Sequence, residues 1–350
     1  MLITGNTGFI GSWLTLWLTN LGADVKGYSK NIPTNPSLFK KLKLEKEMVQ
    51  YFGDVTDRRK LKNAVKRSDP EYIFHLAGQS IVLNSFKNPL ETFHTNIIGT
   101  ANLLDILKDE HGCRSVIIFT SDKCYRNEDN KKYFKENNPL GGNDPYSSSK
   151  AGAELITNSY RKSFFDKMKF PGIATIRSGN VIGGGDWSEF RIVPDTIRSL
   201  NSKKPISIRN PDAIRPFQFV LEPISAMLDL SLNLTKNPKK FSDAWNVGPY
   251  SRKMTNVQNL VDEIIKKWGS GSFRIEKEKK VKEANILLLN SEKIKNELKW
   301  NSAYSTSEAI HQTIKWYKND LVSNDNYQFS LNQINEYILK AKNQKILWAV

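Results

Sequence analysis

The sequence predicts an α/β protein with a doubly wound parallel sheet and a smaller C-terminal lobe. Apolar, β-branched segments alternate with amphipathic helical segments through the first half of the chain, as in sheets whose parallel strands are joined by helices. A glycine-rich turn separates the first such segment from the first helix. From Gly183 onward the pattern becomes irregular and rich in Pro, Asn and Arg, which is expected of an attached lobe.

The glycine-rich turn has the context of a Rossmann-type dinucleotide site. We expect residues 2–4 to form a buried strand and residues 12–21 to form the helix that follows. Between them, Gly5 allows a tight turn, Gly8 lets the backbone approach a pyrophosphate, and Gly11 lets the helix pack closely on the strand. The unpaired N–H groups at the start of that helix would bind the pyrophosphate.

Further strands are expected from the β-branched segments, and ligands bind at the carboxyl ends of such parallel strands. Asp54 and Val55 follow one segment and are expected at the adenine edge of a dinucleotide. Leu76, Ala77 and Gln79 follow the next segment and are expected beside its phosphates and ribose. The expected strands are residues 24–28, 49–52, 72–77, 116–120 and 173–177, with a returning strand at 244–247.

The loop after the second strand leaves the choice between NAD and NADP open. In a typical NAD site a carboxylate at this position accepts hydrogen bonds from the adenosine ribose. This chain has Ser29 there instead, followed by Lys30.

Tyr146 and Lys150 form a predicted redox site. Asp144 is a typical N-cap residue and Pro145 is favoured at the first helical position, so a helix is expected to begin here. At positions i and i+4, Tyr146 and Lys150 share one face of that helix. The ammonium and the helix N-terminus are expected to lower the pKa of the phenol. Such a tyrosine would take a proton from a sugar hydroxyl as hydride leaves the same carbon.

A hydroxyl, an acid and a base follow the strand 116–120 as Ser121, Asp122 and Lys123. Together with the redox site, they predict an internal redox reaction with loss of water. A nucleotide-sugar 4-epimerase would use the same tyrosine, lysine and cofactor, but it needs no acid/base pair after the serine. A protein of another class, a non-catalytic dinucleotide-binding regulator, commonly lacks the tyrosine or the lysine.

The amino-acid composition limits the classes of binding partner and the cellular compartment that we expect for this protein. The net charge is +16, but the lysines are spread along the chain, which suits nucleotide diphosphates better than nucleic acid. The two cysteines and four histidines lack metal-ligand spacing, so we expect no metal site and a reducing, cytoplasmic location. A secretory signal and a membrane-spanning stretch are not evident, so no membrane partner is expected.

The chain is long enough for a large domain and a lobe. We expect residues 1–177, with returning segments at about 216–247, to form the dinucleotide-binding domain, and residues 178–215 and 248–350 to form the substrate lobe and tail. The segments 89–107 and 146–165 have apolar residues spaced by three and four, so they are expected to cover the sheet as helices. The same two helices are expected to pair with a second subunit in a homodimer or higher homo-oligomer.

Nearly the whole chain resembles the extended short-chain dehydrogenase/reductase superfamily and, within it, the CDP-glucose 4,6-dehydratase branch. The string Ser-Asp-Lys-Cys-Tyr at 121–125 and the string Gly-Gly-Gly-Asp-Trp at 183–187 are specific to this branch. Related dTDP-sugar dehydratases carry a glutamate at the position of Lys123, so the lysine favours a CDP-sugar. A dTDP- or UDP-sugar dehydratase is the nearest alternative. The other matching segments are 5–13, 33–39, 74–79, 139–146, 208–211 and 215–223.

The resemblance implies NAD as cofactor and CDP-glucose as substrate. Tyr146, with Lys150 and Ser121, would take the proton of the sugar 4-hydroxyl as hydride passes from C4 to NAD. A base would then remove the C5 proton and an acid would protonate the departing 6-hydroxyl, before hydride returns to C6 of a 4-keto-6-deoxy sugar. Asp122 is the expected acid, and Lys123 is either the base or a charge that stabilises the enolate.

The resemblance also implies the binding residues. Guanidinium groups suit phosphate oxygens, and the expected contacts of the nucleotide-sugar diphosphate are Asn180, Arg191, Arg209 and Arg215. The expected cofactor-binding residues are Gly5, Thr7, Gly8, Phe9, Ile10, Gly11, Ser29, Asp54, Val55, Leu76, Ala77, Gln79, Asn96, Tyr146 and Lys150.

Overall fold

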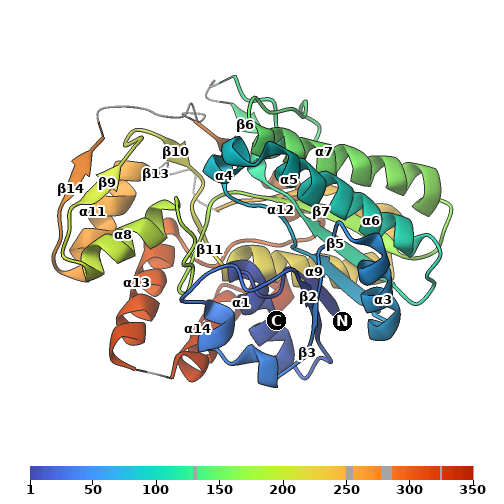
Figure 1. Cartoon of the computed structure of the whole chain (residues 1–350), viewed down its shortest axis with the longest axis horizontal. Helices are drawn as coiled ribbons and strands as arrows, with labels where there is room; N and C mark the ends of the chain where they lie inside the picture. The colour runs from blue at the N-terminus through green and yellow to red at the C-terminus, as the bar shows by residue number, and fades with distance from the viewer. Residues whose placement is uncertain (129–131, 250–254, 277–285, 324, 350) are drawn as a thin grey trace.

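Seven parallel strands form the main sheet of this computed structural model, in the order β12-β7-β5-β4-β1-β2-β3 (Figure 1). The structure describes residues 1–128, 132–249, 255–276, 286–323 and 325–349. Strand order runs outward from β1 in both directions, which confirms the predicted doubly wound fold class. The strands are β1 (Leu2–Thr4), β2 (Lys26–Ser29), β3 (Val49–Phe52), β4 (Tyr72–His75), β5 (Ser115–Phe119), β7 (Gly172–Ser178) and β12 (Ala244–Val247).

The central strands are buried on both faces, as their apolar composition requires. Every residue of β7 is buried, and β5 is buried up to its last residue, Phe119. Alternate residues of one strand enter different cores: Val116 packs with the side chains on one face of the sheet, and Ile117 with those on the other. Helices must therefore cover both faces, which is the arrangement typical of parallel sheets.

The helices α3, α6 and α7 cover one face, and α1 and α9 cover the other (Figure 1). The helices are α1 (Phe9–Asn20), α2 (Leu38–Lys41), α3 (Arg58–Ser68), α4 (Val82–Lys87), α5 (Pro89–Phe93), α6 (Gly99–Leu107), α7 (Pro145–Tyr160), α8 (Ile192–Asn201), α9 (Leu221–Lys236), α10 (Pro238–Phe241), α11 (Val257–Trp268), α12 (Glu292–Glu297), α13 (Thr306–Val322) and α14 (Asn326–Asn343). Shorter helical segments are η1 (Leu44–Lys46), η2 (His94–Ile98), η3 (Asp122–Cys124), η4 (Arg161–Phe165) and η5 (Leu347–Ala349).

Both long helices expected from the sequence contain a π-helical segment. The segment 89–107 consists of α5, the π-helical η2 and α6, and the segment 146–165 consists of α7 continued by the π-helical η4. Asp144 caps α7 by accepting a hydrogen bond from Ser147 N at 2.9 Å, and Pro145 lies in its first turn, as predicted. This capping fixes the start of the helix that carries Tyr146.

Short strand pairs and helices build the C-terminal lobe. The pair of β9 with β14 lies together with α8 and α11 at one end of the molecule (Figure 1). The last helices return to the sheet domain, and Trp17 of α1 makes edge contacts with Tyr337 and Trp348. In the described ranges, no helix is long and apolar enough to cross a membrane. The short strands are β6 (Tyr133–Phe134), β8 (Val181–Ile182), β9 (Ile206–Ile208), β10 (Ile214–Arg215), β11 (Gln218–Phe219), β13 (Thr255–Asn256), β14 (Phe273–Ile275) and β15 (Leu288–Leu289).

Candidate active site

The turn that follows β5 brings the predicted hydroxyl, acid and base together, and we call residues 121–124 the β5 turn. Ser121 begins η3 by accepting a hydrogen bond from Lys123 N at 3.2 Å. The Ser121 hydroxyl donates to Asp122 Oδ1 at 3.0 Å, and Lys123 Nζ lies 3.6 Å from the same oxygen. Asp122 is buried, whereas 24% of the Lys123 side chain is exposed.

Two buried oxygens near the carboxyl ends of the strands lack partners. Asp122 Oδ2 and Asn180 Oδ1 accept no hydrogen bond from any described residue. Leaving a buried polar group unpaired costs about 1–3 kcal/mol, so such atoms commonly have a partner outside the chain. Both oxygens are therefore candidates for contact with a bound substrate.

Tyr146 lies buried in the first turn of α7, which packs against the β5 turn. Burial raises the pKa of its phenol to about 12, and the neighbouring Ser121 hydroxyl and Arg191 guanidinium lower it only in part. The prediction that Lys150 and the helix N-terminus bring this pKa below its ordinary value is therefore wrong for the chain by itself. Loss of hydration outweighs the favourable charges.

Lys150 is buried against the ring of Tyr146. Its Nζ lies 6.0 Å from the ring centroid and donates a hydrogen bond to Phe119 O at 3.4 Å. Burial lowers the pKa of Lys150 to about 8, and the attraction of Glu154 opposes that decrease. The ammonium is therefore retained at neutral pH and lost as the pH rises through about 8.

The glycine-rich turn has the shape that a dinucleotide requires. Gly5 has φ +75°, and a Cβ there would lie 2.6 Å from Ala77 N. A Cβ on Gly11 would lie 2.3 Å from Gly5 O, so only glycine fits at these two positions. Gly8 precedes α1, and no side chain in the described part of the chain caps that helix. Its first N–H groups are open to an anion, and the turn fits a bound pyrophosphate.

A lysine in the loop after β2, beside this turn, pairs with two carboxylates. Lys30 Nζ lies 3.1 Å from Asp54 Oδ2 and 3.2 Å from Glu91 Oε1. Ser29 Oγ donates to Asn6 Oδ1 at 2.7 Å. The two acids neutralise Lys30, whose ammonium would otherwise suit a ribose 2′-phosphate. Sequence reasoning missed Glu91 because it belongs to α5, which only the fold brings beside the loop after β2.

Asn96 fastens the loop after β4 to α7. Its Oδ1 accepts a hydrogen bond from Gln79 N at 2.8 Å, and its Nδ2 donates to Gln79 O at 3.0 Å and to Ser149 Oγ at 2.8 Å. The loop that was predicted to face phosphates and ribose is thus held next to the helix of Lys150. The remaining predicted cofactor residues are Thr7 in the turn before α1, Phe9 and Ile10 in the first turn of α1, Val55 after β3, and Leu76 and Ala77 after β4.

Of the arginines predicted to contact a diphosphate, Arg191 is the one that the structure brings to Tyr146. Its positive charge lowers the pKa of the phenol. The guanidinium donates to Asp186 Oδ2 and to Ser80 Oγ, each at 2.9 Å, and so spans from the lobe to the loop after β4.

Arg209 and Arg215 lie farther into the lobe. Arg209 Nη2 donates to Phe190 O at 3.2 Å. Arg215, on β10, is buried and lines a cavity of about 280 Å³ together with Phe217 and Asn290. The described lining of that cavity contains no residue of the β5 turn or α7.

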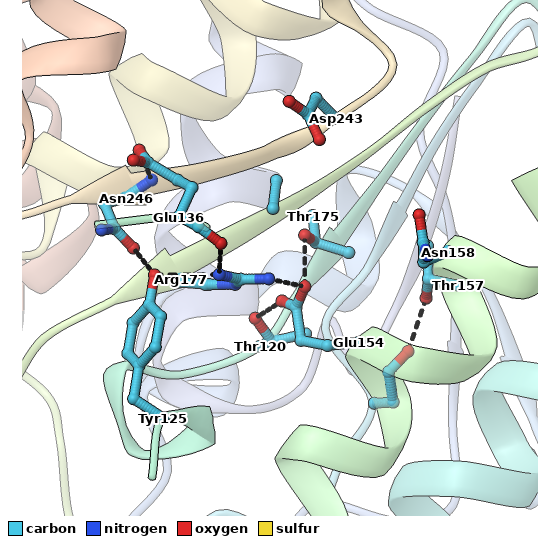
Figure 2. Close-up of polar contacts among 12 residues, drawn as sticks. Thr120, Tyr125, Glu136, Glu154, Thr157, Asn158, Thr175, Arg177, Asp243 and Asn246 are labelled. Carbon is cyan, nitrogen blue, oxygen red and sulfur yellow. Dashed lines mark hydrogen bonds and ion pairs between the residues drawn. The ribbon is translucent and has the colours of Figure 1, made fainter. Parts of the chain in front are cut away.

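A buried ion pair behind the β5 turn was not predicted. Arg177 Nη2 of β7 lies 2.8 Å from Glu154 Oε2 of α7 (Figure 2). Glu154 comes four residues after Lys150, and an acid at that spacing on a buried helix face was the available sequence signal. Arg177 is the penultimate residue of β7, and the sequence does not show which acid faces it.

Comparisons with known proteins agree with this geometry. The sequence profile of the family described as GDP-mannose 4,6 dehydratase matches residues 2–313. A CDP-glucose 4,6-dehydratase of Salmonella typhimurium is 40% identical over 343 residues, which cover 97% of this chain and 96% of that protein.

Solved structures share the fold at lower identity. A dTDP-glucose 4,6-dehydratase of Bacillus anthracis in complex with NAD has a TM-score of 0.76 at 21% identity, covering 91% of this chain and 96% of the other. A UDP-glucuronic acid 4-epimerase of Bacillus cereus has a TM-score of 0.78 at 20% identity, covering 91% and 98%. At these identities, the two structures establish the fold and leave the reaction to other observations.

Proposed function

This chain belongs to the GDP-mannose 4,6 dehydratase family, and on that premise we propose that it converts CDP-glucose to CDP-4-keto-6-deoxyglucose with NAD as cofactor. The observation that carries the substrate choice is Lys123, which lies beside Asp122 in the β5 turn. The related dTDP-sugar dehydratases carry a glutamate at this position. The relative with 40% identity bears the name CDP-glucose 4,6-dehydratase, which supports the same substrate.

NAD fits the glycine-rich turn, with Gly5, Gly8 and Gly11 admitting the pyrophosphate at the start of α1. The bound cofactor would supply the hydride acceptor for C4 of the sugar and the hydride donor for C6. The ion pairs of Lys30 with Asp54 and Glu91 favour NAD over NADP, because they already neutralise the lysine that a 2′-phosphate would need.

Tyr146 takes the proton of the sugar 4-hydroxyl. With a pKa of about 12 the phenol holds its own proton at neutral pH, so nearby positive charge must favour the phenolate. Arg191 already acts in this direction, and Ser121 can orient the sugar hydroxyl at the same oxygen. Lys150 keeps an ammonium against the ring, and it would bind the nicotinamide ribose.

Asp122 and Lys123 carry out the loss of water. The 4-ketone makes the C5 proton acidic, and Lys123 either removes that proton or stabilises the resulting enolate. Asp122 protonates the departing 6-hydroxyl, and its unpaired, buried Oδ2 is the atom suited to contact that hydroxyl. Asn180, Arg191, Arg209 and Arg215 would hold the nucleotide diphosphate.

We also propose a cytoplasmic homodimer, or a higher homo-oligomer, paired through α5, η2 and α7. Leu90, Ile98 and Leu155 expose large apolar side chains on these packed helices, as a subunit contact would require. Both cysteines are free and buried, which suits a reducing compartment. Residues 1–177, with returning segments at about 216–247, would form the NAD-binding domain. Residues 178–215 and 248–350 would form the substrate-binding lobe and the C-terminal tail.

The test is to incubate the protein with NAD and each of CDP-glucose, dTDP-glucose, UDP-glucose and GDP-mannose. Mass spectrometry should detect the loss of one water from CDP-glucose, and the product should be a 4-keto-6-deoxy sugar. Turnover of dTDP-glucose alone would refute the substrate assignment. A 4-epimer formed without loss of water, or no turnover of any sugar, would refute the dehydratase proposal.

A further inference from the structure

The buried ion pair of Glu154 and Arg177 lies behind the β5 turn (Figure 2). Its two side chains form hydrogen bonds to the residue directly before the turn and to the residue directly after it. Glu154 comes from α7, one helical turn beyond Lys150, and Arg177 comes from β7. Arg177 Nη2 lies 2.8 Å from Glu154 Oε2, and the two side chains are only 5% and 3% exposed. The pair therefore lies in the interior, between the helix and the strands that flank the turn.

Glu154 holds the residue before the turn. Its Oε1 accepts a hydrogen bond from Thr120 Oγ1, and Thr120 also bonds through its N–H and hydroxyl to Ile176 O on β7. Glu154 Oε2 accepts a hydrogen bond from Thr175 Oγ1 at 2.9 Å. Because Thr120 directly precedes Ser121, this carboxylate ties the start of the turn to α7 and β7 together.

Arg177 holds the residue after the turn. Its Nη1 donates to Tyr125 Oη at 2.9 Å and to Glu136 O at 2.8 Å. Tyr125 Oη in turn donates to Asn246 Oδ1 of β12 at 2.7 Å. A guanidinium presents its donors in a rigid plane, so it fixes the direction of the groups that it bonds. The end of the turn is thereby tied to β7 and β12 (Figure 2).

We propose that Glu154 and Arg177 are positioning residues, which fix the β5 turn against Tyr146 and keep an anion near Lys150. The proposal rests on the dehydratase function proposed above, in which the turn supplies an acid and a base. A buried ion pair is weak evidence for stability, because apolar residues of similar volume often replace it without loss. Its role here is geometric, since a shift of about 1 Å at a reacting centre can lower a rate by about 100-fold.

The charge of Lys150 provides a second readout. Burial lowers the pKa of Lys150 to about 8, while Glu154 on α7 and Cys124 of the β5 turn oppose that decrease. His75 on β4 faces the same amine but stays neutral, because burial and the lysine charge lower its pKa to about 3. Tyr146 presents its ring at 6.0 Å. Neutralising Glu154 should therefore lower the pKa of Lys150, so that the ammonium is lost at a lower pH.

The experiment compares two variants with a matched control. Glu154→Gln keeps the shape of the side chain and removes its charge, and Tyr125→Phe removes one hydroxyl while leaving the ion pair intact. The control is Arg161→Gln. Arg161 is buried between the same helical run and the same strand, but it bonds to Asn158 Oδ1 and Ile173 O, which lie outside the turn.

Hydrogen exchange of the peptide 120–126 is measured first, without substrate or cofactor. Glu154→Gln and Tyr125→Phe should each increase its exchange, because each releases one end of the turn. Arg161→Gln should leave this peptide at the wild-type rate. Since the measurement needs no turnover, it tests the positioning role even if the protein acts on another sugar.

Steady-state kinetics, with rates expressed per amount of folded protein, then separate an effect on positioning, seen in kcat, from an effect on substrate binding, seen in KM. With CDP-glucose and NAD, kcat should fall about 10- to 100-fold in Glu154→Gln and about fivefold in Tyr125→Phe, with smaller changes in KM. The loss of kcat/KM at alkaline pH should move to lower pH in Glu154→Gln alone. Arg161→Gln should change neither kcat nor the pH profile.

Hydrogen exchange and kcat at wild-type values in Tyr125→Phe would overturn the proposal. Because Tyr125→Phe leaves the Glu154–Arg177 ion pair intact, it still tests the proposal if Glu154→Gln does not fold. An alkaline limb that stays in place in folded Glu154→Gln would overturn the role of the carboxylate toward Lys150. A wild-type protein that turns over no nucleotide sugar would instead refute the proposed function, and the exchange measurement would still decide the positioning role.

Discussion

Replacing Lys150 by methionine is expected to stabilise the folded protein while abolishing turnover. The ammonium is buried, and its pKa falls from 10.5 to about 8 on folding. At about 1.4 kcal/mol per pH unit, carrying the charged lysine costs the folded state about 3 kcal/mol at pH 7. Methionine is apolar and similar in length, so Lys150→Met should raise the free energy of unfolding by about that amount.

This gain should shrink as the pH rises. Between about pH 8 and pH 10.5, the lysine of the folded wild type is neutral while that of the unfolded chain still binds a proton. The unfolded state therefore binds more protons, and wild-type stability increases with pH over this window. The advantage of Lys150→Met should be about 1.4 kcal/mol at pH 9.5 and should disappear above pH 10.5.

Urea unfolding followed by tryptophan fluorescence at pH 7 and pH 9.5 measures the difference. The control is Lys162→Met, an exposed position on η4, which should change the free energy of unfolding by less than about 0.5 kcal/mol. A Lys150→Met variant that is less stable than the wild type at pH 7 would refute a buried ammonium at this site. So would an advantage that stays constant between the two pH values.

Three further substitutions test the reaction and the cofactor site. Tyr146→Phe should lower sugar oxidation by about 10²- to 10⁴-fold, because the phenol moves the 4-hydroxyl proton; single-turnover absorbance of reduced cofactor measures it, and near wild-type oxidation would exclude that role. Lys123→Ala should leave C4 oxidation detectable and block the loss of water, and loss of both steps in a folded variant would show that the lysine acts earlier. Gly11→Ala should weaken NAD binding about 5- to 150-fold, because the added Cβ would lie 2.3 Å from Gly5 O and overpacking costs about 1–3 kcal/mol. Calorimetry that finds wild-type affinity would contradict the proposed pyrophosphate site.

The sheet and the convergence of the site could be predicted because both depend on local sequence. Val116 and Ile117 alternate between two cores, and such β-branched runs indicate a strand covered on both faces. Parallel strands end at one edge of the sheet, where ligands bind, so the β5 turn and the start of the helix that carries Tyr146 are predicted to serve one site. The structure packs these two segments together.

Burial and long-range pairing could not be predicted in the same way. The spacing of Tyr146 and Lys150 places both on one helix face, but it does not show that the phenol loses its hydration and that its pKa rises to about 12. Glu154 meets Arg177 only because β7 lies beside β5 in the sheet. Such partners follow from strand order, and the local pattern around either residue does not contain that information.

CDP-glucose labelled with deuterium at C4 shows whether hydride moves within one sugar as water is lost. After incubation with the protein and NAD, we expect a CDP-4-keto-6-deoxy sugar that carries the deuterium at C6. Deuterium that remains at C4, or a product that keeps all its oxygen atoms, would exclude an internal hydride transfer coupled to loss of water.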